Sequence, residues 1–216
     1  MRKTVCIILL ICLAVSAVGC AGSSGPSSKP GSNGANEEDS IVQFNDQYFE
    51  KCLRQAHKLY GDIHTSDLLK IKDLTLQNFG LTDISDVAKL KNLTWLDLQN
   101  NCISDISALK ELDKLEVLWL SGNQISDISA LSGATKIYSL GLADNSIRDV
   151  SALKNMNGLT MLNLSNNPVS DITVLHGKQR FNMVYLSWTN LTKEQLKAFK
   201  NSINSSATVM TENGLV

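Results

Sequence analysis

Residues 93–112 read LTWLDLQNNCISDISALKEL and residues 115–134 read LEVLWLSGNQISDISALSGA, so one pattern returns after 22 residues. Further copies begin at Ile137 and Leu159, and less regular ones begin at Ile71 and Phe181. A fixed period of this length is typical of a solenoid, in which each turn buries its apolar face against the next turn. We therefore expect about six stacked turns.

Each turn contains the alternation x-Leu-x-Leu-x, which predicts a short strand with both leucines on one face. Leu96 and Leu98 should enter the core, and the strands of successive turns should pair in parallel. An asparagine follows each strand, where the chain must turn. We expect it to point inward and satisfy backbone N–H and C=O groups of the loops. The asparagines in question are Asn101, Asn123, Asn145 and Asn167.

The motif Leu-x-x-Leu-x-Leu-x-x-Asn-x-Ile, continued by Asp-Ile-x-x-Leu, resembles the leucine-rich repeats of bacterial internalins. The resemblance holds almost position by position over residues 93–180. It implies an α/β solenoid with a parallel β-sheet on the concave side, short 3₁₀ or irregular segments on the convex side, and helical caps at both ends. The first and last copies depart from it, with Phe79 and Thr189 in place of asparagine. Degraded end copies are expected where a solenoid must close its core.

Aspartate recurs once in each turn, and two interpretations are open. A column of carboxylates about 4.8 Å apart could bind calcium. We favour helix capping, because each aspartate precedes a short segment whose first N–H groups need acceptors. On this interpretation the chain needs no metal and no cofactor. The residues are Asp83, Asp105, Asp127, Asp149 and Asp171.

Residues 1–19 predict a lipoprotein signal peptide. Arg2 and Lys3 precede an apolar run, residues 5–18, that is too short to span a bilayer comfortably. The run ends in Ala-Val-Gly-Cys20, which resembles the bacterial lipobox and implies that Cys20 carries a lipid. An ordinary secretory signal is the alternative. Residues 20–40 are mostly small and polar, as in a flexible tether.

The flanks of the repeats predict helical caps. We assign residues 41–70 to an N-terminal cap, 71–190 to the repeats and 191–216 to a C-terminal cap. Thr192-x-x-Gln195 is a capping box that should begin a helix in the last segment. In the first cap, a helix after Asn45 or Asp46 should stop near Gly61, and a second should begin at Thr65 or Ser66. The apolar face expected for the first helix comprises Phe49, Cys52, Leu53, Ala56 and either Leu59 or Tyr60.

Composition narrows the classes of function. Twenty basic residues nearly balance 21 acidic ones, and no Lys/Arg cluster exists, which disfavours nucleic-acid binding. The sequence has no histidine pair with metal-ligand spacing, Gly-rich phosphate loop, nucleophile elbow or Cys-x-x-Cys, so we expect no enzyme. Cys52 and Cys102 belong to elements at least one turn apart, so we expect two free thiols. We expect a monomer on the bacterial cell envelope, held to the membrane through the lipid.

The outward positions of the strands carry the candidate binding residues. All three tryptophans of the chain project from the concave sheet or its rim, although the repeat itself does not need aromatic residues there. Cross-strand packing is one explanation. A recognition patch is the one we favour, because tryptophan, tyrosine and methionine are enriched in interfaces. The predicted partner-binding residues are Trp95, Asp97, Val117, Trp119, Tyr138, Met161, Asn163, Met183, Tyr185 and Trp188.

By resemblance, internalin-like proteins use this face for protein ligands, so we expect a protein partner in adhesion or in host or envelope contact. A glycan-binding module would use Trp95, Trp119 and Trp188 as stacking platforms for sugars. A structural envelope component without a discrete ligand is the third possibility.

Overall fold

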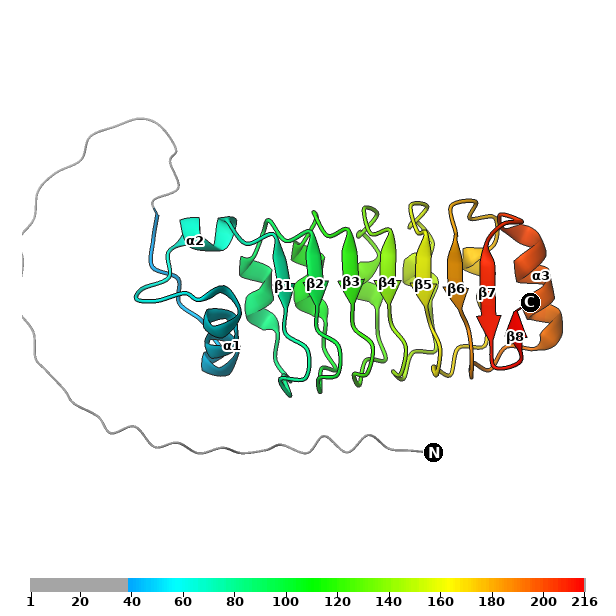
Figure 1. The fold of residues 1–216 in the computed structure, drawn as a ribbon, viewed down its shortest axis with the longest axis horizontal. Helices are drawn as coiled ribbons and strands as arrows, with labels where there is room; N and C mark the ends of the chain where they lie inside the picture. Colours follow the sequence, from blue (N-terminus) through cyan, green and yellow to red (C-terminus); the bar gives the residue numbers. More distant parts are fainter. Residues whose placement is uncertain (1–38, 216) are drawn as a thin grey trace, which may run out of the picture.

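The computed structural model describes residues 39–215, in which eight strands form one sheet with short helices behind it and a cap at each end (Figure 1). The predicted signal peptide, Cys20 and most of the tether lie outside the described residues. The strands follow one another in sequence order; β1 to β7 are parallel and β8 is antiparallel. They are β1 (Asp73–Thr75), β2 (Trp95–Asp97), β3 (Val117–Trp119), β4 (Ser139–Gly141), β5 (Met161–Asn163), β6 (Met183–Tyr185), β7 (Thr208–Thr211) and β8 (Gly214–Leu215).

The register of the sheet equals the sequence period. Leu96 pairs with Leu118, and Leu118 with Leu140, and all three side chains are fully buried. The leucines therefore form columns that run along the solenoid and make one continuous core. The solenoid predicted from the repeat is confirmed.

The asparagine ladder joins neighbouring turns. Asn123 donates from Nδ2 to the carbonyls of Leu120 in its own turn (2.9 Å) and Leu98 in the preceding one (3.0 Å). Its Oδ1 accepts from the N–H of Ile103 at 3.0 Å. In the last turn Thr189 does part of this work, because its hydroxyl donates to the Leu186 carbonyl at 2.9 Å. Each polar side chain thus satisfies backbone groups that the turn would otherwise bury unpaired.

Short 3₁₀ helices form the back of the sheet, and the recurring aspartates cap them. In each turn Oδ1 of the aspartate accepts the backbone N–H two residues later, at 2.7–2.8 Å. These backbone hydrogen bonds lower the pKa of Asp127 and Asp171. The capping interpretation is confirmed. The helices are η1 (Ser85–Lys89), η2 (Ser107–Glu111), η3 (Ser129–Leu131), η4 (Ser151–Leu153) and η5 (Thr173–Leu175).

The N-terminal cap contains α1 (Gln47–His57) and α2 (Thr65–Leu69). Asp46 is the N-cap of α1 and accepts from the N–H of Tyr48 at 2.7 Å. The expected stop at Gly61 is wrong, because Lys58 already leaves the helix with a left-handed backbone at φ 53°. The change of direction turns Tyr60 into solvent, and Ala56 is also exposed, so neither belongs to the buried face.

A buried carboxylate fastens this cap to the first repeat. Asp86 is fully buried and accepts from the backbone N–H groups of Asn45 (2.7 Å) and Asp46 (2.8 Å). It also pairs with Lys89 of the same 3₁₀ helix. The chain entering α1 is therefore held by the turn that follows β1.

The C-terminal cap covers the other end of the core. Helix α3 (Lys193–Ser202) begins with the capping box expected at Thr192 and Gln195. Phe199 is fully buried and meets the ring of Phe181 edge-on, with 6.1 Å between ring centroids. The final strand pair, β7 and β8, extends the sheet beyond the last repeat.

The two cysteines of the described region differ. Cys52 is a free, buried thiol on α1, and burial raises its pKa. Cys102 is disulfide-bonded, so the expectation of two free thiols is wrong for this residue. The bond does not join Cys102 to Cys52, in keeping with the separation of their elements. The spacing of Cys52 and Cys102 bears only on a bond between these two residues, so it could not predict a bond from Cys102 to another residue.

Between residues 39 and 215, none of the helices has the length and apolar character needed to cross a bilayer.

Candidate binding face of the sheet

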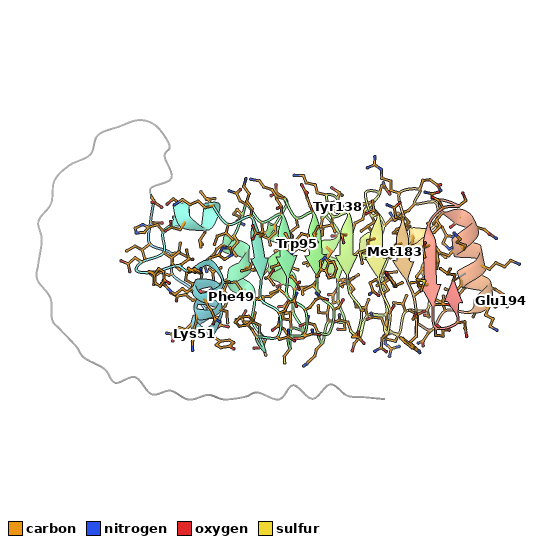
Figure 2. All side chains as sticks on the ribbon, viewed as in Figure 1. Phe49, Lys51, Trp95, Tyr138, Met183 and Glu194 are labelled. Carbon is orange, nitrogen blue, oxygen red and sulfur yellow. The ribbon has the colours of Figure 1, made fainter. Side chains whose placement is uncertain are left out.

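The outward positions of β1 to β6 make up the face predicted to bind a partner, which we call the concave face. Figure 2 shows Trp95 and Met183 projecting from the sheet, with Tyr138 nearer one of its edges. The ten predicted residues differ in exposure. Trp95, Tyr138, Met183 and Trp188 are exposed, Trp119, Met161, Asn163 and Tyr185 are half-buried, and Asp97 and Val117 are buried.

Two tryptophans on neighbouring strands form a stacked pair. The ring centroids of Trp95 and Trp119 are 6.4 Å apart with 17° between the ring planes. Trp95 lies opposite Val117 in the register and Trp119 opposite Asp97, so the tryptophans occupy one diagonal of this square of residues. The two tryptophans therefore form one contiguous aromatic patch on the face predicted to bind a partner.

This stacking explains why two predicted contact residues are covered. Asp97 and Val117 occupy the other diagonal, and they are only 5% and 3% exposed. Each is flanked in the register by the two indoles, whose bulk accounts for this low exposure. The expectation that both would be open to a partner is therefore wrong, and it leaves Trp95, at 41% exposure, as the accessible member of the square.

Two glutamine neighbours of Asp97 are not among the residues predicted from the sequence. Gln77 of the preceding turn donates from Nε2 to the Asp97 carboxylate. Gln99 donates from both its backbone N–H (3.1 Å) and its side-chain amide (3.2 and 3.3 Å). Both glutamines lie two residues beyond an outward strand position, in the column that the sequence argument did not map. Glutamine at the same position of two successive turns is the sequence signal that could have predicted these contacts.

The indole N–H of Trp119 has no hydrogen-bond partner among the described residues, although the atom is buried. The ring reaches over Gly141 on β4, where a methyl group would lie 3.9 Å from Cδ2 of the indole. A buried donor without an acceptor is uncommon in folded proteins. The stack with Trp95 therefore keeps Trp119 in a position that its own polar atom does not favour.

A second apolar cluster lies on β5 and β6. The Ser139 hydroxyl donates to the sulfur of Met161 at 3.5 Å, and the Tyr185 hydroxyl donates to the sulfur of Met183. Between this cluster and the tryptophan pair, β4 carries only the small side chains of Ser139 and Gly141 outward. The concave face thus presents two apolar clusters, one of Trp95 and Trp119 and one of Met161, Met183 and Tyr185. The small outward side chains of β4 separate them.

Trp188 stands at a strained backbone position on the rim. It has φ 53° and is 70% exposed. The equivalent residue of every other turn also has a positive φ, but it is always asparagine, aspartate or glycine, which tolerate this conformation. Those residues are Asn78, Asn100, Gly122, Asp144 and Asn166. A large aromatic residue here costs backbone energy and gains little burial.

Replacing Trp188 with asparagine should therefore raise the free energy of unfolding by about 1 kcal/mol. The backbone hydrogen bond from residue 188 to Glu212 (3.2 Å) does not depend on the side chain and should persist. Urea unfolding of the two proteins measures the difference. A lower midpoint for Trp188→Asn would mean that the indole contributes packing that offsets the strain.

Comparisons with known proteins agree with this geometry. The sequence profile of the family "Leucine Rich repeats (2 copies)" matches residues 91–133, which comprise β2, η2, β3 and η3. The chain is a leucine-rich repeat solenoid. None of the curated proteins compared with it matches significantly.

Several solved structures have the same leucine-rich repeat fold. An internalin of Listeria monocytogenes is 27% identical, with a TM-score of 0.61 over 78% of this chain. This chain spans 55% of that internalin. Internalin C2 of the same species is 24% identical, with a TM-score of 0.60 over 77% of this chain and 83% of its own length. A leucine-rich repeat protein of Leptospira interrogans is 19% identical, with a TM-score of 0.60 over 66% of this chain and 38% of its own.

On the convex side of the repeats, a cavity of about 640 Å³ lies between η2 and η3. Lys110, Asp105 and Asp127 contribute to its walls. Both aspartates already accept the backbone hydrogen bonds that cap these helices. Capping of the 3₁₀ helices thus explains why these carboxylates are present, and they do not indicate a ligand site. We therefore retain the concave face as the candidate site.

Proposed function

We propose that this protein is a lipid-anchored protein of the bacterial envelope whose concave face binds another protein. The observation that carries the proposal is the stacked pair of Trp95 and Trp119 in the sheet, with Trp95 left 41% exposed. Exposed aromatic clusters mark interaction sites, and tryptophan is prominent among residues that dominate binding energy.

Three further features support a binding role. The six repeat strands span about 24 Å, enough for a protein contact of standard size. Met183 and Tyr138 add exposed apolar surface on the same sheet. Trp188 keeps an exposed indole at a strained position, and such strain is often retained at functional sites.

The fold favours this function over catalysis, because leucine-rich repeats are interaction scaffolds. The repeats of this chain also resemble those of an internalin. The partner-binding set on this proposal is centred on Trp95 and Trp119, with Met161, Met183, Tyr185, Asn163, Tyr138 and Trp188 around them. Asp97 and Val117 support the tryptophans from beneath. A glycan ligand remains the second candidate, since Trp95 exposes a flat ring beside amide and carboxylate groups.

Anchoring is tested at Cys20. Cys20→Ala should abolish incorporation of a palmitate analogue and leave the precursor unprocessed, because the lipid is expected on that sulfur. Metabolic labelling in the native host, followed by gel fluorescence, makes the measurement. Equal labelling of wild type and variant would refute the anchor and favour an ordinary secretory signal.

Partner binding is tested by capture. Purified protein immobilised on beads should retain a specific protein from envelope extract or host-cell lysate, and Trp95→Ala should release it. Purified oligosaccharides added as competitors distinguish the classes of ligand, because a protein partner would be indifferent to them. Capture that is unchanged by Trp95→Ala would contradict binding by the concave face.

A further inference from the structure

The outward and rim positions of the concave face are richer in acid than the chain as a whole. The chain has 20 basic and 21 acidic residues. Over the strand segments of the six repeats, residues 71–78 and the five equivalent octets, the acidic residues are Asp73, Asp97, Glu116 and Asp144, and the basic residue is Lys72. None of these carboxylates takes part in an ion pair within residues 39–215.

Two of these carboxylates lie at outward positions next to Trp95, and a third lies just before β3. Asp73 is its direct neighbour on β1, and Asp97 follows two residues later on the same side of β2. Glu116 is exposed just before β3. Figure 2 shows Trp95 on the face of the sheet turned to the viewer.

The strand order places Trp95 between an aromatic and an acidic neighbour. Trp119, the stacking partner of Trp95, belongs to β3 on one side of it. On the other side lies β1, where Asp73 and Thr75 are exposed. The exposed ring of Trp95 therefore adjoins the exposed side chain of Asp73, and we call these two side chains the Trp95–Asp73 surface.

Asp97, on β2 beside Trp95, has no cationic partner among residues 39–215. The carboxylate is 5% exposed, and its hydrogen-bond donors are the neutral groups of Gln77 and Gln99. Buried carboxylates usually have a cationic partner, because losing water is costly for a charge. Asp97 is too buried to touch a partner, but its carboxylate adds to the acidic character of the surface around Trp95.

We propose that the Trp95–Asp73 surface binds an arginine side chain of the protein partner. The inference rests on the proposed function and names the chemistry of its ligand. A guanidinium is planar, so it can lie on the open face of Trp95, and its N–H groups can donate to carboxylates in a paired geometry. Asp73 supplies an exposed carboxylate that can contact the guanidinium. Asp97 is buried and contributes negative charge without direct contact. Lysine has a compact charge without a stacking surface and should fit less well.

The test uses purified protein and fluorescein-labelled hexa-arginine, hexa-lysine and hexa-glutamate peptides, followed by fluorescence anisotropy in about 50 mM salt. Hexa-arginine should bind at least about threefold more tightly than hexa-lysine, and hexa-glutamate should not bind. Raising the salt to about 500 mM should weaken binding at least about tenfold, because the contact depends on charge.

Variants distinguish binding at the Trp95–Asp73 surface from a general attraction of cationic peptides to acidic residues. Asp73→Asn and Trp95→Leu should each weaken hexa-arginine binding at least about threefold. Asp113→Asn is the matched control, because it removes the same charge from an exposed residue outside the sheet and should leave binding unchanged. Asp73 is exposed and lacks a side-chain hydrogen bond in the described region, so its variant should fold normally, which thermal unfolding checks.

Four results would overturn the inference. One is equal weakening by Asp73→Asn and Asp113→Asn, which would indicate diffuse attraction. Another is binding of a neutral oligosaccharide that needs Trp95 while hexa-arginine fails to bind. The third is a captured protein partner that needs Trp95 but ignores Asp73→Asn; the proposed function would then stand without this inference. The fourth is that neither partner capture nor peptide binding depends on Trp95, which would overturn the proposed function as well as this inference.

Discussion

Replacing Leu118 with alanine should lower the free energy of unfolding by about 2–5 kcal/mol. The side chain is fully buried in the middle of the sheet, between Leu96 and Leu140 of the neighbouring turns. Removing it leaves a cavity inside a column that every turn shares, and neighbours fixed by the sheet register cannot close in to fill it. Urea unfolding followed by circular dichroism measures the change.

Leu215→Ala provides a matched control, because the same atoms are removed from a side chain that is 74% exposed. This variant should unfold within about 0.5 kcal/mol of the wild type. Equal midpoints for Leu118→Ala and Leu215→Ala would show that the inward assignment of the leucine columns is wrong.

Trp95→Ala should weaken binding of the protein partner about thirtyfold, equivalent to about 2 kcal/mol. The indole is exposed beside the stacked Trp119 and so can be covered by a partner without rearranging the core. Stability should change little. Surface plasmon resonance with the captured partner gives the affinity, and thermal unfolding gives the stability.

Trp95 is a cleaner probe of binding than Trp119. Trp119 is half-buried whereas Trp95 is 41% exposed, so the loss of Trp119 would disturb stability more. Lys110→Ala, on the convex side, should leave affinity unchanged. If Trp95→Ala sharply lowers the unfolding temperature yet the partner still binds with wild-type affinity, the aromatic pair has a structural role.

The repeat period was enough to predict most of the fold, because a strict 22-residue spacing dictates both the strand and its register. The leucine columns, the asparagine ladder and the aspartate caps follow from the same rule, as Leu118, Asn123 and Asp127 illustrate. Equivalent residues of successive turns have the same environment and lie next to one another in space. A pattern within one turn therefore predicts contacts between residues that are 22 positions apart.

The sequence could not predict features that depend on side-chain direction between turns. Alternation along a strand places Asp97 and Val117 outward, but it does not say that two indoles will lean over them. Exceptions to the repeat were equally hidden. Lys178 occupies a column position filled by Leu112 and Met156 in other turns, and it is buried with its ammonium donating to the Lys154 carbonyl at 2.8 Å. Burial lowers the pKa of this lysine.

Hydroxyl-radical footprinting of the protein with and without its captured partner tests the concave face most directly. Trp95, Tyr138 and Met183 are exposed in the free protein, so the partner should protect all three from oxidation. Tyr60 is 86% exposed on the N-terminal cap and should react equally in both states. Protection of Tyr60 with unchanged oxidation of Trp95 would place the partner elsewhere and contradict binding by the sheet.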